Sequence, residues 1–346
     1  MKLSPKHLWK CWRATRLSST AVQAMTFYPQ HRQKPLAAIR RELFALCVSN
    51  KAGYSIDSTI SQYFQHGVDR AGEKCADYLF QKEFDRLRDQ HLTPLAFMLD
   101  SKWITNKYLT ACGIRTSNAL TISKRNTQRL YSALDATQAR EFFAKPEVGI
   151  QGKNSFPFSI SNGMFLYRGE QRTEAEMLPL LQNHIIEEKI VQHPSLDTLY
   201  PHAVSSIRLV TVLRNEHVEI FSKFILLGSG GACVSNGPAG GIAVGIDDSG
   251  KLCSLGHRNV APHGKYAAHP DTGIAFKGLQ LPFWEECLAL VQAAHLCLPS
   301  IYSIGWDIAI TPSGPIIIEA NRDWGTALDG SIYGPSRTRA EHYFAS

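Results

Sequence analysis

The sequence contains no Cys-x-x-Cys pair and no cysteine or histidine spacing typical of a bound zinc ion. Its eight cysteines are scattered along 346 residues, and a chain of this length does not need disulfides to fold. We therefore expect reduced thiols in a cytoplasmic protein. Scattered cysteines are typical of buried, inert thiols, so a covalent thiol intermediate is not expected.

Long apolar runs are also missing. No stretch approaches the roughly 20 apolar residues that cross a bilayer, and Lys2 is not followed by an apolar run of secretory type. The sequence predicts neither a membrane span nor export. Its apolar content of 44% is ordinary for a globular protein, and its length predicts one large domain with a smaller appendage.

Acidic residues are absent before Glu42. This basic arm has the charge to contact an anionic membrane surface, a nucleic acid or an acidic polymer, and Trp9 and Trp12 between the cations suit a helix at an interface. Its composition also resembles a transit peptide. A solvated or docked helix is the simpler interpretation, and we do not expect nucleic acid as a partner. The cations of the arm are Lys2, Lys6, Lys10, Arg13, Arg16, Arg32, Lys34, Arg40 and Arg41.

The pattern of the chain changes near residue 99. Residues 1–98 have the apolar spacing of helices. A helix is expected from Lys102 to Cys112, ending at Gly113, and short β-like runs with glycine and asparagine turns follow. We therefore predict an α+β fold, with a helical region at 1–98, a catalytic domain at 99–335 and a tail at 336–346.

The last two β-like runs form the strongest local pattern. Ile304–Thr311 and Pro315–Asn321 predict two strands around a tight turn. With a three-residue loop, Asp307 lies directly opposite Glu319 and diagonal to Asn321. Their Cβ atoms would then be roughly 5 Å apart across the strands.

Two carboxylates held that closely repel each other. They require either a shared proton or a bound cation, and the neighbouring Asn321 amide favours the cation. Hard oxygen ligands suit Mg²⁺ better than Zn²⁺. The sequence therefore predicts a magnesium site at Asp307, Glu319 and Asn321, with a solvent-exposed polar sheet face as the alternative.

Two lysines occur near a glycine-containing turn. Lys145 lies in a short apolar strand, and Lys153 follows Gly149 and Gly152. Backbone amides and ammonium groups in such a turn can hold phosphates. An exposed hairpin with solvated lysines explains the same residues equally well.

A second hairpin is predicted from Ser206–Arg214 and His217–Leu226. Pairing the residues next to its two-residue turn makes Arg208 oppose Lys223. Two facing cations are unfavourable unless a polyanion lies between them. We therefore predict an anion site there, with solvent exposure of both residues as the alternative.

A slot for a nucleotide base is predicted after a helix that a capping box at Thr173–Glu176 opens. The apolar strand that follows carries Glu187 and Glu188, and the backbone from Glu187 through Lys189 to Ile190 would read an adenine edge. A surface strand with solvated acids is the alternative.

The order of these features resembles the ATP-grasp superfamily. Four segments are more closely similar to the sugar-transfer-associated ATP-grasp family, whose relatives include α-L-glutamate ligases. They are Gly305–Thr311, Ile318–Asn321, Asn236–Gly241 and His269–Gly273. The resemblance covers residues 95–330.

The resemblance implies that ATP lies between two α+β lobes. It places Lys145 and Lys153 on the phosphates, Glu187, Glu188, Lys189 and Ile190 along the adenine, and Arg208 and Lys223 on phosphate oxygens. It also implies that Asp307, Glu319 and Asn321 hold Mg²⁺ and that Asn236 closes over the reacting groups. Asp197 is a candidate for the ribose, although its spacing departs from the family pattern. Candidates for the acceptor pocket are His269, Asp271, Arg322, Asp323 and Trp324, for which loop structure is an equal explanation.

The expected activity is that of an ATP- and Mg²⁺-dependent ligase, which joins a small-molecule carboxylate to an amine or other nucleophile through an acyl phosphate. By analogy, the substrate is linked to a sugar or polysaccharide, as in glycan or cell-surface polymer modification. Two alternatives remain at this point: a phosphotransferase on the same nucleotide site, and a noncatalytic basic binding protein. Peripheral membrane contact through the basic N-terminal arm is a further expectation.

Overall fold

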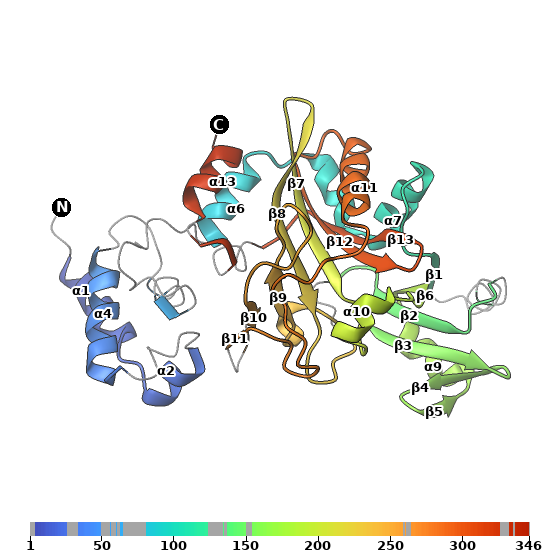
Figure 1. Ribbon diagram of the computed structural model, residues 1–346, viewed down its shortest axis with the longest axis horizontal. Coiled ribbons are helices and arrows are strands. Elements are labelled where there is room, and N and C mark those ends of the chain that lie inside the picture. Colours follow the sequence, from blue (N-terminus) through green and yellow to red (C-terminus); the bar gives the residue numbers. More distant parts are fainter. Residues whose placement is uncertain are drawn as a thin grey trace.

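The structure is a computed structural model with an α+β architecture built on two antiparallel sheets. The residues that it describes are 4–25, 34–49, 56, 60, 63–64, 81–123, 134, 137–149, 154–258, 260, 264–325, 332–334 and 336–345. The two sheets lie side by side, and a group of N-terminal helices lies at the opposite end of the longest axis from the smaller sheet (Figure 1).

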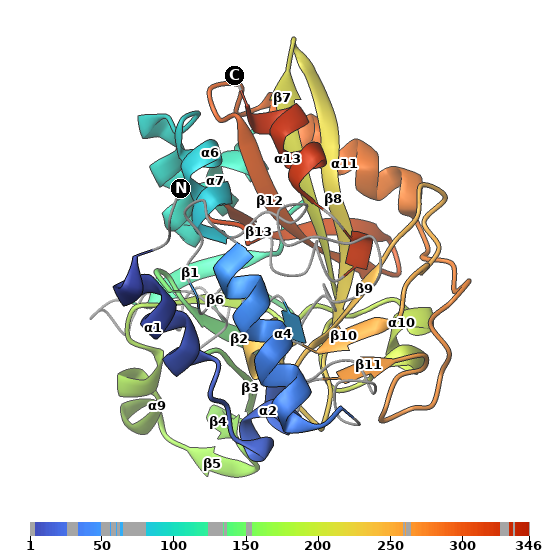
Figure 2. The same ribbon diagram turned by 90° about the vertical axis from the view of Figure 1, so that its left-hand side faces the viewer.

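The N-terminal part is helical throughout the residues described, as the sequence predicts. Its elements are α1 (Pro5–Ala14), α2 (Ser19–Met25), α4 (Leu36–Ser49), α6 (Gln81–Asp89) and the 3₁₀ helix η2 (Pro94–Asp100). Helices α1, α2 and α4 contribute to a separate hydrophobic core, which includes Cys11, Leu43 and Tyr63. In Figure 2 this group faces the viewer, in front of the sheets.

The smaller sheet has six strands in the order β1-β6-β2-β3-β4-β5, and every neighbouring pair is antiparallel. The helix α9 (Glu174–Leu181) begins with the predicted capping box, in which Glu176 accepts from the Thr173 N–H at 2.7 Å. The strands are β1 (Ala119–Ser123), β2 (Glu141–Pro146), β3 (Phe156–Ser161), β4 (Met164–Tyr167), β5 (Glu170–Arg172) and β6 (His184–Glu188).

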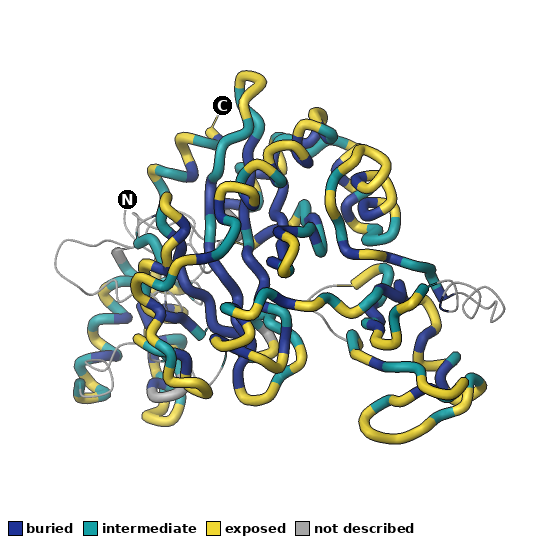
Figure 3. The backbone as a smooth tube through the Cα atoms, turned by 45° about the vertical axis from the view of Figure 1, so that its right-hand side comes forward, coloured by how far each residue is buried: buried dark blue, intermediate teal, exposed yellow. Residues whose placement is uncertain are grey.

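The larger sheet has seven strands in the order β11-β10-β9-β8-β7-β12-β13. The helix α11 (Trp284–Leu296) packs on one face. Phe84 of α6 and Phe344 of α13 (Arg337–Phe344) pack with Trp324 over the other face. These strands pass through the buried middle of the molecule (Figure 3). They are β7 (Ser206–Arg214), β8 (His217–Leu227), β9 (Ile242–Gly245), β10 (Gly256–Arg258), β11 (Gly264–Tyr266), β12 (Ser303–Thr311) and β13 (Gly314–Asn321).

Three further short elements complete the described fold. The helix α7 (Lys102–Ala111) ends beside Gly113, close to the predicted position, and packs on β13. The chain after it, Arg115–Ser117, runs along the outer edge of β13. There the Ile317 N–H donates to Arg115 O and the Ser117 N–H donates to Ile317 O, both at 2.9 Å. The remaining elements are α10 (Pro194–Leu199) and the 3₁₀ helix η3 (Gly237–Ala239).

The β12–β13 hairpin differs from the predicted one at its loop. Thr311 pairs with Gly314, so the loop has two residues rather than three, and a bulge at Ile318 inserts one extra residue further along β13. The two changes cancel. Asp307 therefore pairs with Glu319, as predicted, and Gly305 pairs with Asn321.

The β7–β8 hairpin has the predicted turn, with both Asn215 and Glu216 at positive φ. A bulge between Val210 and Thr211 then shifts the pairing by one residue. Arg208 consequently pairs with Phe224, and Lys223 pairs with Leu209. Because neighbouring positions of a strand point to opposite faces, the predicted facing pair of Arg208 and Lys223 is wrong.

The cysteines within the described residues are all free thiols, and Cys75 lies outside those residues. Among the helices described, none combines the length and the hydrophobicity that a bilayer crossing requires. The proposed division at residues 98 and 335 stays a prediction, because packing alone does not define those boundaries.

Candidate active site

A cavity of about 580 Å³ lies between the two sheets. One wall comes from β2 and β6, the other from β7, β12 and β13, and the segments 189–206 and 233–236 complete its lining. The charged residues of the lining are Lys102, Glu141, Lys145, Glu187, Glu188, Lys189, Asp197, Arg208, Asp307 and Glu319. Both signs of charge therefore surround a space of the size that small-molecule sites usually have.

Arg208, Asp307 and Glu319 form a row across three neighbouring strands. Asp307 on β12 pairs with Arg208 on β7 and with Glu319 on β13. Directly paired residues of antiparallel strands share a face, and all three line the cavity. The row exists because β12 is central, so its one acidic residue faces a cation on one side and a second carboxylate on the other.

The contacts of Asp307 balance its charge within the protein. Arg208 donates from Nε to Oδ1 at 2.7 Å and from Nη2 to Oδ2 at 2.9 Å. The Asn321 amide donates to Oδ2 at 3.2 Å, and the Ser206 hydroxyl donates to Oδ1 at 3.3 Å. Asn321 is thus brought to the acidic pair, as the sequence predicts, although it does not line the cavity itself.

Lys145 projects from β2 toward the larger sheet. Its Nζ lies 2.7 Å from Glu187 Oε1 on β6 and donates to Ile318 O at 3.2 Å. Ile318 is the bulge residue of β13, so the bulge directs a carbonyl toward a lysine of the other lobe. The side chains of Lys145 and Glu187 are only 8% and 3% exposed, and this burial makes the ion pair costly to break from one side.

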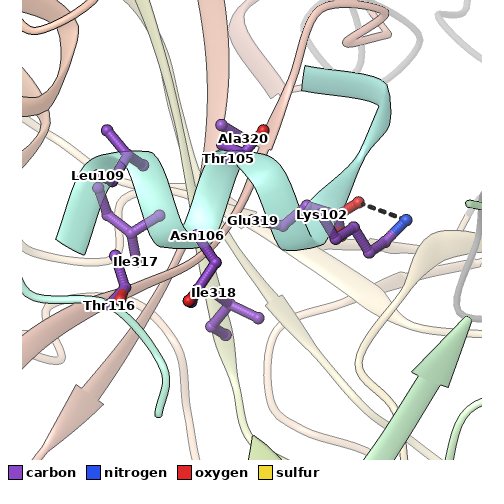
Figure 4. Close-up of a pocket in the computed structure, with 9 residues that line it drawn as sticks. All are labelled: Lys102, Thr105, Asn106, Leu109, Thr116, Ile317, Ile318, Glu319 and Ala320. Carbon is purple, nitrogen blue, oxygen red and sulfur yellow. Dashed lines mark ion pairs between the residues drawn. The ribbon is translucent and has the colours of Figure 1, made fainter. Parts of the chain in front are cut away.

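Lys102 is a site residue that the sequence analysis missed. It is the first residue of α7, and Ser101 caps the helix by accepting from Ile104 N. Lys102 Nζ lies 3.1 Å from Glu319 Oε1 and donates to Gly149 O at 2.7 Å. Figure 4 shows it reaching Glu319 at one end of a small cavity between α7 and β13. The available signal was the serine cap, which fixes where α7 begins but gives no hint of what its first lysine contacts.

The predicted adenine strand lies in the cavity wall, but part of its backbone is already bonded. The Glu188 N–H donates to Asn118 O at 3.1 Å, and the Lys189 N–H donates to Glu141 O at 3.0 Å. Within the described part of the chain, the Ile190 N–H has no hydrogen-bond partner. Of the predicted edge, the Ile190 amide is therefore the donor that a ligand can use without breaking a bond of the fold.

Glu187 contributes to the site differently from the prediction. Its side chain accepts from Ser117 Oγ at 2.7 Å and pairs with Lys145. The acid is thus 2% exposed and serves to hold the lysine. Burial lowers the pKa of Lys107, which lies near the same acid, although Glu187 acts against that shift. Glu187 is therefore a positioning residue rather than a contact for the base.

Asn236 lies at the far end of the cavity from β2, at the start of a tight turn. Its Oδ1 accepts from Ala239 N at 2.8 Å, and Gly241 N donates to Asn236 O at 2.9 Å. A Cβ on Gly241 would lie 2.5 Å from that oxygen, so the close backbone approach requires glycine. The turn holds Asn236 where its side chain borders the cavity.

Other predicted residues lie elsewhere. Lys223 does not line the cavity and pairs with Asp248, and Lys153 lies outside the described residues. Asp197 does border the cavity, where it accepts from the Gln192 amide at 3.0 Å. The five acceptor-pocket candidates do not line it: His269, Asp271, Arg322, Asp323 and Trp324.

The contacts of these five candidates are structural. His269 is 1% exposed and its Nε2 lies 2.9 Å from Gly228 O. Asp271 accepts from Gly230 N, Arg322 pairs with Asp100, and Trp324 is buried in the aromatic core beside α13. Loop and core structure, the alternative explanation for these residues, is therefore the correct one for this cavity.

Comparison with known proteins supplies an independent observation. The model of a protein family described as sugar-transfer associated ATP-grasp matches residues 86–336. No curated protein matches the chain.

Three solved structures have detectable likeness to the chain. They are D-alanine–D-alanine ligase from Helicobacter pylori (15% identity, TM-score 0.44, 72% of this chain and 61% of that chain), carboxyaminoimidazole ribonucleotide synthase from Aspergillus clavatus complexed with ATP (9%, 0.39, 65% and 45%), and L-amino acid ligase from Bacillus licheniformis (11%, 0.38, 66% and 41%). This chain thus spans between 41% and 61% of the length of these three proteins.

Proposed function

Because this chain belongs to the sugar-transfer associated ATP-grasp family, we propose that it is an ATP- and Mg²⁺-dependent ligase that joins a carboxylate to an amine through an acyl phosphate. Its two α+β lobes have the ATP-grasp fold. The observation that carries the proposal is the row of Arg208, Asp307 and Glu319, which faces Lys145 of the other lobe across one cavity.

The cations of the cavity are assigned to the triphosphate. Lys145, Lys102 and Arg208 each line the cavity and each already pairs with a carboxylate of the protein. A bound polyanion offers these groups a second set of oxygens, and the carboxylates keep the cations in place before it arrives. Lys153 retains its predicted role on the phosphates as a proposal.

The adenine is assigned to the segment from Glu188 to Ile190. The support is its place in the cavity wall and the Ile190 amide described above. Asp197 remains the candidate for the ribose, because its carboxylate borders the same cavity.

The residues present fit a magnesium ion. Asp307 and Glu319 are directly paired carboxylates, and Asn321 contacts Asp307, so the donor set consists of hard oxygens from adjacent strands, as Mg²⁺ prefers. Asp307, Glu319 and Asn321 would hold the ion, which when bound offsets the charge of the phosphates. Arg208 and Lys102 supply the balancing charge for the two acids in its absence.

The chemistry assigned to the site has two steps. An oxygen of the substrate carboxylate attacks the γ-phosphorus of ATP, and ADP leaves, so that an acyl phosphate forms. The nitrogen of an amine then attacks the acyl carbon, inorganic phosphate leaves and the nitrogen loses a proton. Lys145 and Arg208 orient the phosphates in the first step, and Asn236 borders the end of the cavity where the acceptor would enter.

The substrates remain a proposal by analogy with the family name. A carboxylate or amine carried on a sugar or polysaccharide is the expected substrate class. The five residues first considered for its pocket do not border the cavity. Residues of the segment 201–206, together with Asn236, do border it and take their place in this proposal.

The proposal is tested by calorimetric titration with ATP in the presence and absence of Mg²⁺. We expect binding that requires the metal and is lost in Glu319→Gln. Products of an incubation with ATP, amino acids and sugar acids are then identified by mass spectrometry. A ligase forms ADP and phosphate only when both a carboxylate and an amine are present. A stable phosphorylated product without a second substrate would instead identify a phosphotransferase, and no metal-dependent binding would refute both enzymes.

A further inference from the structure

The helix α1 has two faces of different character. Cys11 and Thr15 are 0% and 3% exposed and lie on the side that packs against α4. The other side carries Leu8, Trp9 and Trp12, which are 37%, 53% and 48% exposed. The spacing of these residues explains the division, because positions three or four apart lie on one side of a helix.

Exposed tryptophans next to an exposed leucine are a costly use of surface. Large aromatic rings usually bury their apolar area and leave only a polar atom in water, and an exposed apolar patch marks a surface that contacts another phase or molecule. α1 is anchored on its other side by the N-terminal core. The apolar patch therefore does not contribute to the packing of the helix.

The charges around this patch have one sign. Lys6, Lys10, Arg13 and Arg16 are exposed around it, and the sequence has no acidic residue before Glu42. Arg13 lies over the Trp9 ring at 5.3 Å and Arg16 over the Trp12 ring at 4.3 Å. The rings and the cations are thus presented together on one exposed surface.

We propose that α1 docks the protein on an anionic lipid bilayer, lying in the plane of the interface. An apolar strip beside cations is the pattern of interfacial helices, in which Trp enters the headgroup region and Lys or Arg pairs with lipid phosphates. An aliphatic residue in the strip and paired tryptophans favour lipid over nucleic acid, whose backbone is contacted chiefly by cations and polar groups. The ten residues of α1 are about 15 Å long, enough to lie along the headgroups but not to cross the bilayer.

Docking through α1 leaves the catalytic lobes away from the lipid. α1 lies at one end of the longest axis and the six-stranded sheet at the other (Figure 1). The contact is thus separate from the nucleotide cavity, and the proposal does not depend on the assigned ligase activity.

The test is cosedimentation of the full chain with vesicles of phosphatidylcholine alone or of phosphatidylcholine mixed with phosphatidylglycerol. We expect partitioning at least about tenfold stronger into the mixed vesicles, which weakens at high salt. Tryptophan emission should shift to shorter wavelength on binding, and Trp9→Ser with Trp12→Ser should remove both the shift and most of the partitioning.

Matched variants separate charge from shape. Arg13→Ser with Arg16→Ser should lower partitioning by about tenfold or more, whereas Arg13→Lys with Arg16→Lys retains it. Arg168→Ser with Lys277→Ser removes two exposed cations elsewhere and should leave binding unchanged. All substituted side chains are exposed, so thermal melting should remain near that of the parent chain.

Two results would overturn the proposal. One is equal partitioning of the parent chain and the tryptophan variant into the mixed vesicles. The other is binding to an RNA or DNA oligonucleotide, with the same dependence on the arginines, by a chain that ignores the vesicles.

Discussion

Arg208 contacts both carboxylate oxygens of Asp307, at 2.7 Å from Nε and 2.9 Å from Nη2, although the two residues lie on different strands. The bidentate contact holds the acid in one orientation, toward Glu319 and the cavity. It also keeps a cation beside the place where phosphate oxygens are expected. The strand pairing therefore brings together the acid and the base that the proposed reaction needs.

The first prediction concerns the acid of this pair. Asp307→Asn should abolish metal-dependent ATP binding and lower ligase turnover by about a hundredfold or more, because it removes one charge from the site that offsets the phosphates. Calorimetry and product assays check this. Asp248→Asn changes an exposed carboxylate outside the cavity and should have little effect. Wild-type binding by Asp307→Asn would contradict the assignment.

The buried pair of Lys145 and Glu187 predicts a difference between stability and binding. Lys145→Met leaves the Glu187 charge buried without its partner, so the free energy of unfolding should fall by about 3 kcal/mol or more. Lys145→Met combined with Glu187→Gln removes both charges and should recover most of that loss, as urea denaturation would measure.

The double variant should still bind ATP weakly, because the phosphate contact of Lys145 is missing from it. Recovery of ATP affinity together with stability would show that Lys145 acts only through Glu187. Calorimetric titration distinguishes these outcomes. Lys145→Arg is a less disruptive companion variant, since it retains the charge.

Lys102 predicts a role for a residue without any motif. Because its ammonium joins Glu319 of one lobe to Gly149 of the other side of the cavity, Lys102→Met should weaken ATP binding by about tenfold or more. Lys251→Met, which alters an exposed lysine outside the cavity, is the control. Unchanged ATP affinity in Lys102→Met would show that this pair is only structural.

A buried histidine predicts how stability depends on pH. Burial lowers the pKa of His257 from 6.5 to about 3, and the neighbouring Lys265 adds to the shift. The unfolded chain therefore binds a proton near pH 6.5 that the folded chain refuses, so the stabilisation is complete above pH 6.5 and is lost as pH falls toward 3. At pH 5 the loss is about 2 kcal/mol.

The variant His257→Leu should remove that part of the acid sensitivity. Urea denaturation at pH 7 and pH 5 gives the two free energies of unfolding, and their difference should shrink by about 2 kcal/mol. His217→Leu changes an exposed histidine and should leave the difference as it is. An equal pH dependence of His257→Leu and the parent chain would refute the prediction.

The sequence predicted most accurately where alternation was long. Both hairpins of the larger sheet begin and end within a residue or two of the expected positions, because period-two alternation specifies which face a residue occupies. The facing of Asp307 and Glu319 was correct for an incomplete reason, since the shorter loop and the bulge at Ile318 offset each other.

Bulges explain the main failure. Nothing in the pattern around Phe221 announces the extra residue that moves Lys223 opposite Leu209, because a bulge is chosen by the twist and packing of the whole sheet. Lys102 was missed for a related reason. Its contact with Glu319 joins residues 217 positions apart, so only the docking of α7 on β13 creates it.

The pairing of Arg115–Ser117 with Ile317 has a consequence for how the protein behaves at high concentration. The outermost strand of a sheet normally offers a free row of backbone groups, which can recruit a strand from another molecule and start aggregation. In β13 the N–H and C=O of Ile317 are already bonded to the passing chain. The strand that carries the acidic site is thereby protected, at its middle, from unwanted association with its own copies.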